Sequence, residues 1–220
     1  MAIPVILAVA LHEVAHGYVA YLKGDDTAKK MGRLTINPLA HIDLFGTVLL
    51  PILFYMTAGF LFAFAKPVPV NFHNLRDPKR DMALVAAAGP AVNILLAIVS
   101  ALLFKFFGFL NPDSMSEFYT NLMGKTEGIG GTFAVPVLYM LYFSVTLNVV
   151  LAVINMIPIP PADGGRVVIG FLPDKQAAIY SRIEPIGLII LILILFLNPF
   201  NILGVTIEPL IKFMLGLLLF

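Results

Sequence analysis

Five apolar segments, each long enough to cross a lipid bilayer, constrain this chain more than any other feature. A spanning helix needs about 20 mostly apolar residues, and such segments cover 3–22, 44–65, 83–109, 133–157 and 185–203. Of the 220 residues, 60% are hydrophobic and 12% are charged, whereas a soluble domain carries about 25% charged residues. We therefore expect an α-helical polytopic membrane protein, built as a single domain over residues 1–220. A further apolar piece, 209–220, is short for a span.

The basic residues of the polar connections predict which segments cross the bilayer. Connections 23–43, 66–82 and 158–184 hold four, four and three Lys or Arg residues, whereas 110–132 holds one. Such residues concentrate in cytoplasmic loops, and the first three connections share one side only if segment 44–65 enters and leaves on that side. Gly46, Pro51 and Gly59 interrupt this segment, as suits a re-entrant element buried in protein. The sequence thus predicts about four spanning helices plus one re-entrant or broken segment.

Two polar stretches have patterns typical of short β-strands. Residues 32–37 alternate polar and apolar side chains and stop at Pro38, which favours a strand. Residues 66–71 contain Pro67 and Pro69, which exclude a helix and favour an extended edge strand. A plain loop is an equally good interpretation of both stretches.

The first apolar segment contains the sequence His12-Glu13-Val14-Ala15-His16. Residues i and i+4 share one face of a helix, so the two imidazoles can bind one zinc ion while Glu13 acts on a water beside it. Ionisable side chains inside a span are costly and usually functional. The alternative is a polar helix face buried against partner helices. The chain has no cysteine, so the metal ligands must be His, Asp or Glu.

A catalytic zinc site needs a third protein ligand, and Asp163 is the best candidate. His41 and His73 lie in polar connections, whereas Asp163 follows a span, after three prolines and before two glycines. Prolines break the helix and glycines permit unusual dihedral angles, so an unwound segment would present this carboxylate; a simple turn before glycine is the alternative. Asp163 reaches the depth of the histidines only if segments 3–22 and 133–157 run in the same direction. That requirement agrees with a non-spanning segment 44–65 and puts the site toward the cytoplasmic side.

At this point the sequence resembles the site-2 protease family of intramembrane zinc metalloproteases, in its short bacterial and archaeal form without a PDZ domain. The resemblance is carried, in order, by His12 to Gly17, by 31–38 with His41, Asp43, Gly46 and Thr47, by 66–71, by 88–93 and by 155–165. It implies that His12, His16 and Asp163 bind zinc, that Glu13 is the general base, and that Asn93 and Asn155 line the active-site region. The chain departs from the family at Ala162, where leucine is usual, and only eleven residues precede His12, fewer than is usual in the family, which leaves the extent of the first helix open.

We therefore expect a zinc-dependent intramembrane endopeptidase with one Zn²⁺ per chain. A zinc-activated water would attack a peptide bond of a transmembrane protein substrate, with Glu13 as general base. The amide of Asn155 would contact the oxyanion or the substrate backbone, although helix–helix hydrogen bonding explains Asn155 equally well and Asn93 better. An unwound substrate would pair with the backbone of Val68 and Val70, unless 66–71 is only a linker.

Two other classes of protein remain as alternatives. A membrane transporter or channel with a structural metal site would need polar residues in several spans, and apart from Glu13 no span carries a carboxylate in its middle. A catalytically inactive scaffold of the same family would not need an intact glutamate. The net charge of +1 gives no sign of a nucleic acid partner. We expect the lipid bilayer as the environment, a prokaryotic plasma membrane as the location, and leave a regulatory membrane partner open.

Overall fold

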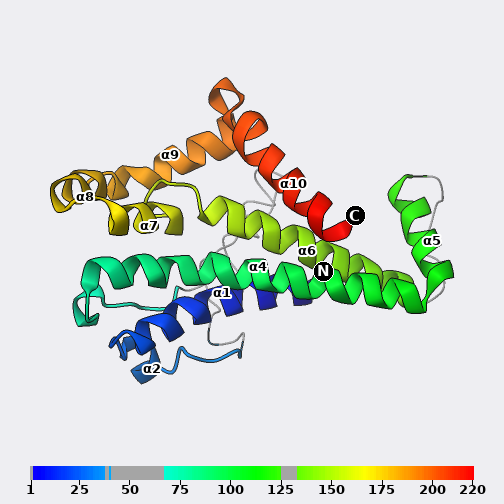
Figure 1. Cartoon of the computed structure of the whole chain (residues 1–220), viewed down its shortest axis with the longest axis horizontal. Coiled ribbons are helices and arrows are strands. Elements are labelled where there is room, and N and C mark those ends of the chain that lie inside the picture. The colour runs from blue at the N-terminus through cyan, green and yellow to red at the C-terminus, as the bar shows by residue number, and fades with distance from the viewer. Residues whose placement is uncertain (1, 38–39, 41–66, 125–132) are drawn as a thin grey trace, which may run out of the picture. The chain divides into compact units, whose positions relative to one another are not determined.

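The computed structural model describes residues 2–37, 40, 67–124 and 133–220, and the regular elements in these ranges are all helices. The longer ones are α1 (Ala2–Leu22), α4 (Pro78–Leu110), α5 (Pro112–Leu122), α6 (Ala134–Asn155), α7 (Asp163–Phe171), α8 (Asp174–Ser181), α9 (Glu184–Leu197) and α10 (Glu208–Leu219) (Figure 1). The shorter ones are α2 (Thr27–Lys30), η3 (Phe72–Asn74), η4 (Pro199–Asn201) and η5 (Leu203–Ile207).

Within the described residues, three helices are long and apolar enough to cross a membrane, namely Ile3–Leu22, Pro78–Leu110 and Ala134–Asn155. They correspond to three of the five segments that hydropathy predicts. A fourth span results if Asp174–Ser181 and Glu184–Ile194 are one element, because these two helices pass the test together despite a bend of 63° between them. The polytopic helical fold is therefore supported, while the re-entrant segment 44–65 lies outside the described residues.

The two predicted strands are not confirmed, because the described parts of 32–37 and 66–71 contain no strand. The reason is that their backbone groups bond elsewhere. The N–H of Arg33 donates to the carbonyl of Ala28 and so closes the turn after α2. In the second stretch, the N–H groups of Val68 and Asn71 donate to the side chains of Glu13 and Asp25. Residues 67–71 thus form an irregular segment that side chains hold in place, and not a paired strand.

The chain divides into two compact units, and one of them comprises Met1–Ala8, Asn93–Ile154 and Leu193–Phe220. Its core centres on Phe118 of α5, which is fully buried. The ring of Phe118 contacts Phe104, Tyr139 and Tyr142 at centroid distances of 5.3, 4.8 and 5.5 Å. Aromatic pairs at these separations add to the stabilisation from apolar burial, so Phe118 helps to hold α5 to α4 and α6.

Polar side chains also link helices in this first unit. The hydroxyls of Ser100 and Ser144 lie 2.8 Å apart, and the amide of Asn93 donates to Asn148 at 2.8 Å and to the carbonyl of Ala8 at 3.3 Å. Hydrogen bonds between side chains are a common means of helix association in an apolar environment. Asn93, with Asn148 as its partner, therefore has the helix–helix contacts that the sequence offers as the alternative to a role in the active site.

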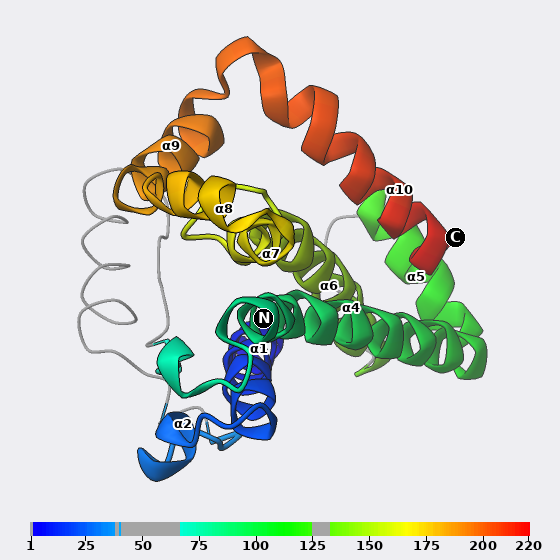
Figure 2. The ribbon, with the colours of Figure 1, turned by 60° about the vertical axis from the view of Figure 1, so that its left-hand side comes forward.

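The second unit comprises Val9–Val92 and Asn155–Ile192 and contains the candidate site. Its helix α4 begins at Pro78, where a proline fits because the first turn needs no N–H donor. Asp81 in that turn accepts a hydrogen bond from the N–H of Asp77 at 3.0 Å and forms an ion pair with Lys23 at 3.2 Å. The residue after α1 is thereby joined to the start of α4. Figure 2 shows the short helix α2 close to the end of α1.

Candidate metal centre

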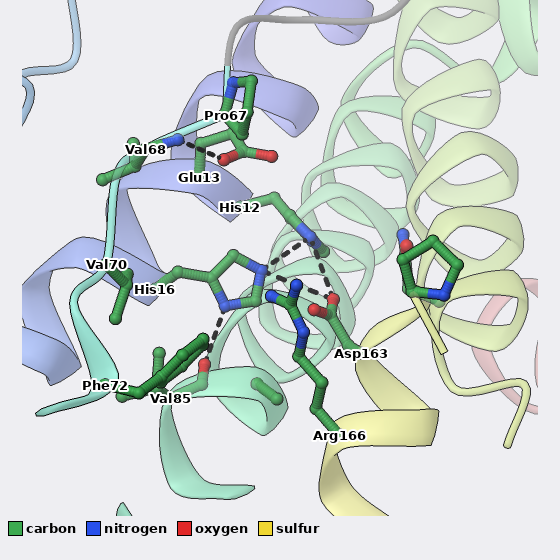
Figure 3. A pocket seen from close by; sticks show the side chains of 13 residues that line it. His12, Glu13, His16, Pro67, Val68, Val70, Phe72, Val85, Asp163 and Arg166 are labelled. Atoms are coloured by element: carbon green, nitrogen blue, oxygen red, sulfur yellow. Dashed lines mark hydrogen bonds and ion pairs between the residues drawn. The ribbon is translucent and has the colours of Figure 1, made fainter. Parts of the chain in front are cut away.

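The two histidines of α1 point from one helix face toward Asp163 (Figure 3). The Nε2 atoms of His12 and His16 lie 3.0 Å apart, and they lie 3.3 and 3.4 Å from Oδ2 of Asp163. His12 and Asp163 are buried, with 8% and 9% of their surface exposed. The structure thus brings together the three residues that the sequence assigns to the metal, from segments about 150 positions apart.

The loop after α6 explains how Asp163 is presented. Helix α6 ends at Asn155, and Asp163 is the first residue of α7, preceded by Ala162 with an extended backbone. The sequence assigns Gly164 and Gly165 to unusual dihedral angles, but both lie within α7 and neither has a positive φ. Glycine is needed at both positions for close packing. A Cβ atom on Gly164 would lie 2.3 Å from the carbonyl oxygen of Met156, and one on Gly165 would lie 2.3 Å from the nitrogen of Pro160.

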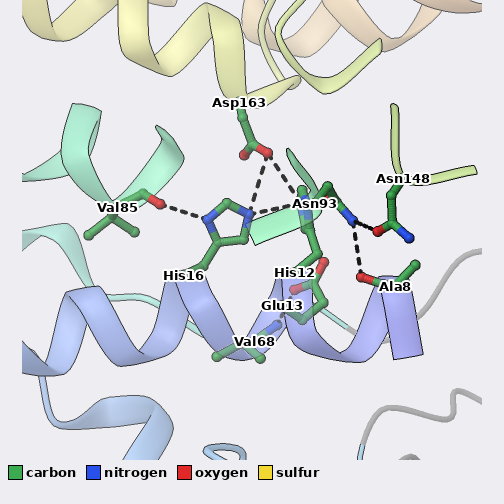
Figure 4. Close-up of polar contacts among 9 residues, drawn as sticks. All are labelled: Ala8, His12, Glu13, His16, Val68, Val85, Asn93, Asn148 and Asp163. Carbon is green, nitrogen blue, oxygen red and sulfur yellow. Dashed lines mark hydrogen bonds and ion pairs between the residues drawn. The ribbon is translucent and has the colours of Figure 1, made fainter. Parts of the chain in front are cut away.

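The ring of His16 is held in the orientation that a metal ligand needs. Its Nδ1 atom lies 2.7 Å from the carbonyl oxygen of Val85 on α4, and Nδ1 must be the donor because a carbonyl only accepts. In the neutral imidazole, Nε2 then carries the lone pair and faces the cluster (Figure 4). Such a partner for the second ring nitrogen is typical of metal-binding histidines.

The three donor atoms fit a tetrahedral zinc site. Ligands at about 2.0–2.2 Å from zinc lie about 3.3–3.6 Å from one another in a tetrahedron. The two separations from Asp163 fall in this range, and the two imidazole nitrogens lie slightly closer, at 3.0 Å. Within the described part of the chain, Oδ2 of Asp163 is buried and has no hydrogen bond of good geometry. Burial alone would raise the pKa of Asp163, but the imidazoles of His12 and His16 lower it to about 2, so the carboxylate is ionised as a metal ligand must be.

Glu13 faces a cavity of about 400 Å³ beside this cluster. Its Oε2 atom accepts a hydrogen bond of 2.8 Å from the N–H of Val68, which fixes the carboxylate to segment 67–71. The cavity is lined by the cluster and Glu13, and further by Pro67, Val68, Val70, Phe72, Val85, Ala86, Asn155, Pro161 and Arg166. A carboxylate, a candidate metal cluster and part of segment 67–71 therefore share one cavity.

The other predicted site residues have different positions. Asn155, Val68 and Val70 line the cavity, whereas Asn93 is not among its lining residues and bonds with Asn148. The N–H of Val68 is already used by Glu13, so a substrate strand would have to pair through other backbone groups of this segment. His73 lies in η3, where its N–H donates to the side chain of Asn71, and it does not belong to the cluster.

Sequence reasoning missed Arg166 as a cavity residue. Its guanidinium forms an ion pair with Glu184 at 3.1 Å and lies over the ring of Phe72 at 5.4 Å. The signal was present in the sequence, because residues three apart on a helix share a face and Arg166 is three residues after Asp163. The side chain places a positive charge in the cavity (Figure 3).

Gly89 gives the most direct test of the cluster's geometry. A Cβ atom on Gly89 would lie 2.5 Å from both Cε1 of His12 and Nε2 of His16, so alanine must displace the imidazoles. We expect Gly89→Ala to weaken zinc binding about 10–100-fold, the usual cost of disturbing the groups around metal ligands, as measured by competition titration. Gly216→Ala is the matched control, because nothing lies within 4 Å of that Cβ position. Unchanged zinc affinity in Gly89→Ala would show that the ion binds elsewhere.

Comparison with known proteins identifies the family. The model of peptidase family M50 matches residues 1–198. YwhC of Bacillus subtilis (strain 168), provisionally named a zinc metalloprotease, is 36% identical over 199 residues, which cover 90% of this chain and 80% of YwhC. Rip2 of Mycolicibacterium smegmatis, named in the same way, is 25% identical over 197 residues, covering 89% of this chain and 66% of Rip2. Rip2 of Mycobacterium tuberculosis is 26% identical over 195 residues, covering 88% and 65%. No solved structure matches the chain significantly.

These matches extend over most of the chain, and the match to the family model includes the cluster and its cavity. They agree with the resemblance to site-2 proteases that the sequence motifs indicate. The membrane-spanning length of three helices is compatible with this family. The chain therefore belongs to peptidase family M50 and is a zinc metalloprotease.

Proposed function

We propose that this protein is an intramembrane endopeptidase that uses one Zn²⁺ per chain to hydrolyse peptide bonds of transmembrane proteins. The observation that carries the proposal is the convergence of His12, His16 and Asp163 beside Glu13 in one cavity. In peptidase family M50, such a set of groups has an immediate chemical use. The whole chain, residues 1–220, would serve as a single catalytic domain.

His12, His16 and Asp163 would hold the zinc ion and leave one coordination position open, as catalytic zinc sites do. When bound, zinc would act as a Lewis acid that activates water and polarises the peptide carbonyl. The carbonyl of Val85 keeps the lone pair of His16 directed at the site. Gly89 leaves room for both rings, since any side chain at that position would overlap them.

Glu13 would act as the general base and then as the general acid. The N–H of Val68 holds Oε2, and we assign the proton transfer to the other carboxylate oxygen. This oxygen would take a proton from the attacking water and deliver it to the amine that leaves, so that Glu13 ends the cycle in its starting form. Proton transfer by a well-placed carboxylate contributes about 10²–10⁴-fold to such reactions.

Substrate would bind in the cavity as an extended peptide. The carbonyls of a helix are occupied by its own hydrogen bonds, so a transmembrane segment must unwind before it is cleaved. We propose that the backbone near Val70 and the amide of Asn155 contact the unwound chain, because both residues line the cavity beside the cluster. Val68 also lines the cavity, while its N–H serves Glu13.

The alternatives are not equally supported. Membership of a peptidase family gives a transporter or channel no support. An inactive scaffold would have no need of a cavity in which Glu13 is held beside the candidate ligands. Membrane proteins are the substrates that a protease embedded in the bilayer meets first. A regulatory membrane partner stays a prediction.

Replacement of Glu13 by glutamine tests the proposed reaction. Glu13→Gln keeps the shape of the side chain and removes the proton acceptor, so we expect zinc content to remain and cleavage to slow by at least about 100-fold. The assay is hydrolysis of single-span membrane proteins in vesicles that also contain the purified enzyme. Glu208→Gln is the control, since Glu208 is 60% exposed and pairs only with Lys212 among described charges. Equal turnover by Glu13→Gln and wild type would remove Glu13 from the reaction.

The distribution of basic residues leads us to propose that the site opens toward the cytoplasm. Single cysteines can be introduced without interference, because the chain has none. A cysteine in 66–82 or 158–184 should react with an impermeant label only after the cytoplasmic face is made accessible, and one in 110–132 should react from the outside. Labelling of 66–82 from the outside would contradict this orientation and the predicted re-entrant segment.

A further inference from the structure

The segment 67–75, which we call the strap, is held by two carboxylates, that of Glu13 on α1 and that of Asp25 just after α1. The N–H of Val68 donates to Oε2 of Glu13 at 2.8 Å, and the N–H of Asn71 donates to Oδ2 of Asp25 at 2.7 Å. These two donors are three residues apart on the strap. Glu13 and Asp25 therefore act on one short piece of backbone.

Asp25 is built into the fold as an anchor. It is fully buried, three residues beyond the end of α1. Its Oδ1 accepts from the side-chain amide of Asn74 at 2.9 Å and from the backbone N–H of Thr27 at 3.2 Å, and also from the hydroxyl of Thr27. Burial would raise the pKa of Asp25, but these hydrogen bonds outweigh it and lower the pKa. The carboxylate thus stays ionised and keeps both oxygens as acceptors.

The strap lies directly against α1 between these two anchor points. A Cβ atom on Gly17 would lie 2.6 Å from Cγ1 of Val68, so the absence of a side chain at Gly17 lets the strap approach the helix. Val68 is buried in that contact, with 6% of its surface exposed. Farther along, the N–H of Arg76 donates to the carbonyl of Lys23 at 3.1 Å. A shift of the strap at Asp25 must therefore be transmitted to the hydrogen bond at Glu13.

We propose that Asp25 is a positioning residue for catalysis: by fixing the strap at Asn71 and Asn74, it holds the N–H of Val68 where it orients the carboxylate of Glu13. This role rests on the proposed function of Glu13. Among the described residues, Asp25 belongs neither to the cluster nor to the residues that line the cavity. Its effect on the reaction passes through the strap alone.

An ionised carboxylate is required at this position. In Asp25→Asn one oxygen becomes an NH₂ group, which only donates. If NH₂ faces Asn71, two N–H donors oppose each other and the strap is released. If it faces Asn74, the amide of Asn74 can turn and accept from it, but the backbone N–H of Thr27, which donates to the same oxygen, then meets a donor. Either orientation therefore sets a fixed backbone N–H against a donor and loosens the anchor that holds the strap.

The experiment compares Asp25→Asn with Asp26→Asn in the full-length, zinc-loaded protein. Asp26 is the adjacent residue, is 46% exposed and pairs only with Lys30 on the surface among the described charges. For Asp25→Asn we expect unchanged zinc content, faster hydrogen exchange at the amides of Val68 and Asn71, and kcat about 10–100-fold lower with KM little changed, because small displacements of catalytic groups can cost about 10²-fold. The substrate is whichever single-span protein the wild type cleaves in vesicles. Asp26→Asn should match the wild type in all four quantities.

A double-mutant cycle separates positioning from general destabilisation. Val68→Pro deletes the N–H that reaches Glu13 and suits a non-helical backbone, so adding Asp25→Asn to it should lower kcat no further.

If Asp25→Asn loses zinc through misfolding, Asn74→Ala is the milder variant. It removes one of the strap's two links to Asp25, and a smaller loss of kcat is expected. The positioning role would be contradicted if the Asp25 or Asn74 variants had the kcat of the wild type, or if the losses of kcat in Asp25→Asn and Val68→Pro were additive. Neither outcome would affect the proposed function. A wild type that cleaves no single-span protein would contradict the proposed function, and the positioning role with it.

Discussion

The structure depends on bringing two imidazole nitrogens and one carboxylate oxygen to within 3.4 Å of one another in a largely apolar protein. Two imidazoles and a carboxylate are costly to bury. Among the described residues, no group forms a hydrogen bond of good geometry with Oδ2 of Asp163. A divalent cation at their centre would remove that cost. This requirement explains why the surrounding backbone is so closely packed.

Small residues make that approach feasible. Gly89 lies against both histidine rings, and Gly164 and Gly165 lie against the loop that follows α6. Gly17, directly after His16, lets the strap reach α1. Each of these glycines faces atoms that a Cβ would overlap, so glycine is required there by space and not by an unusual backbone angle.

The sequence alone predicted the helical class and the three clustered residues, because both rest on local signals. The spacing of His12 and His16 follows from helical periodicity, and Asp163 is marked by the prolines and glycines around it. The predicted strands failed because alternation within a few residues does not reveal competing acceptors such as Glu13 and Asp25. Asp25 was not predicted as a functional residue, since its partner Asn71 is 46 positions away and no periodic pattern connects the two. Asn93 was assigned to the active-site region by resemblance, and its observed partners are Asn148 and Ala8.

We propose that His12, His16 and Asp163 hold the zinc ion that Glu13 serves. X-ray absorption at the zinc edge of the purified, zinc-loaded protein tests this assignment, with Asp163→Ala measured beside the wild type. We expect a shell of two imidazole nitrogens and additional oxygen at about 2.0–2.2 Å, with at least one oxygen ligand lost or replaced in Asp163→Ala. A wild-type shell with one imidazole or with three, or identical spectra for the two proteins, would contradict it.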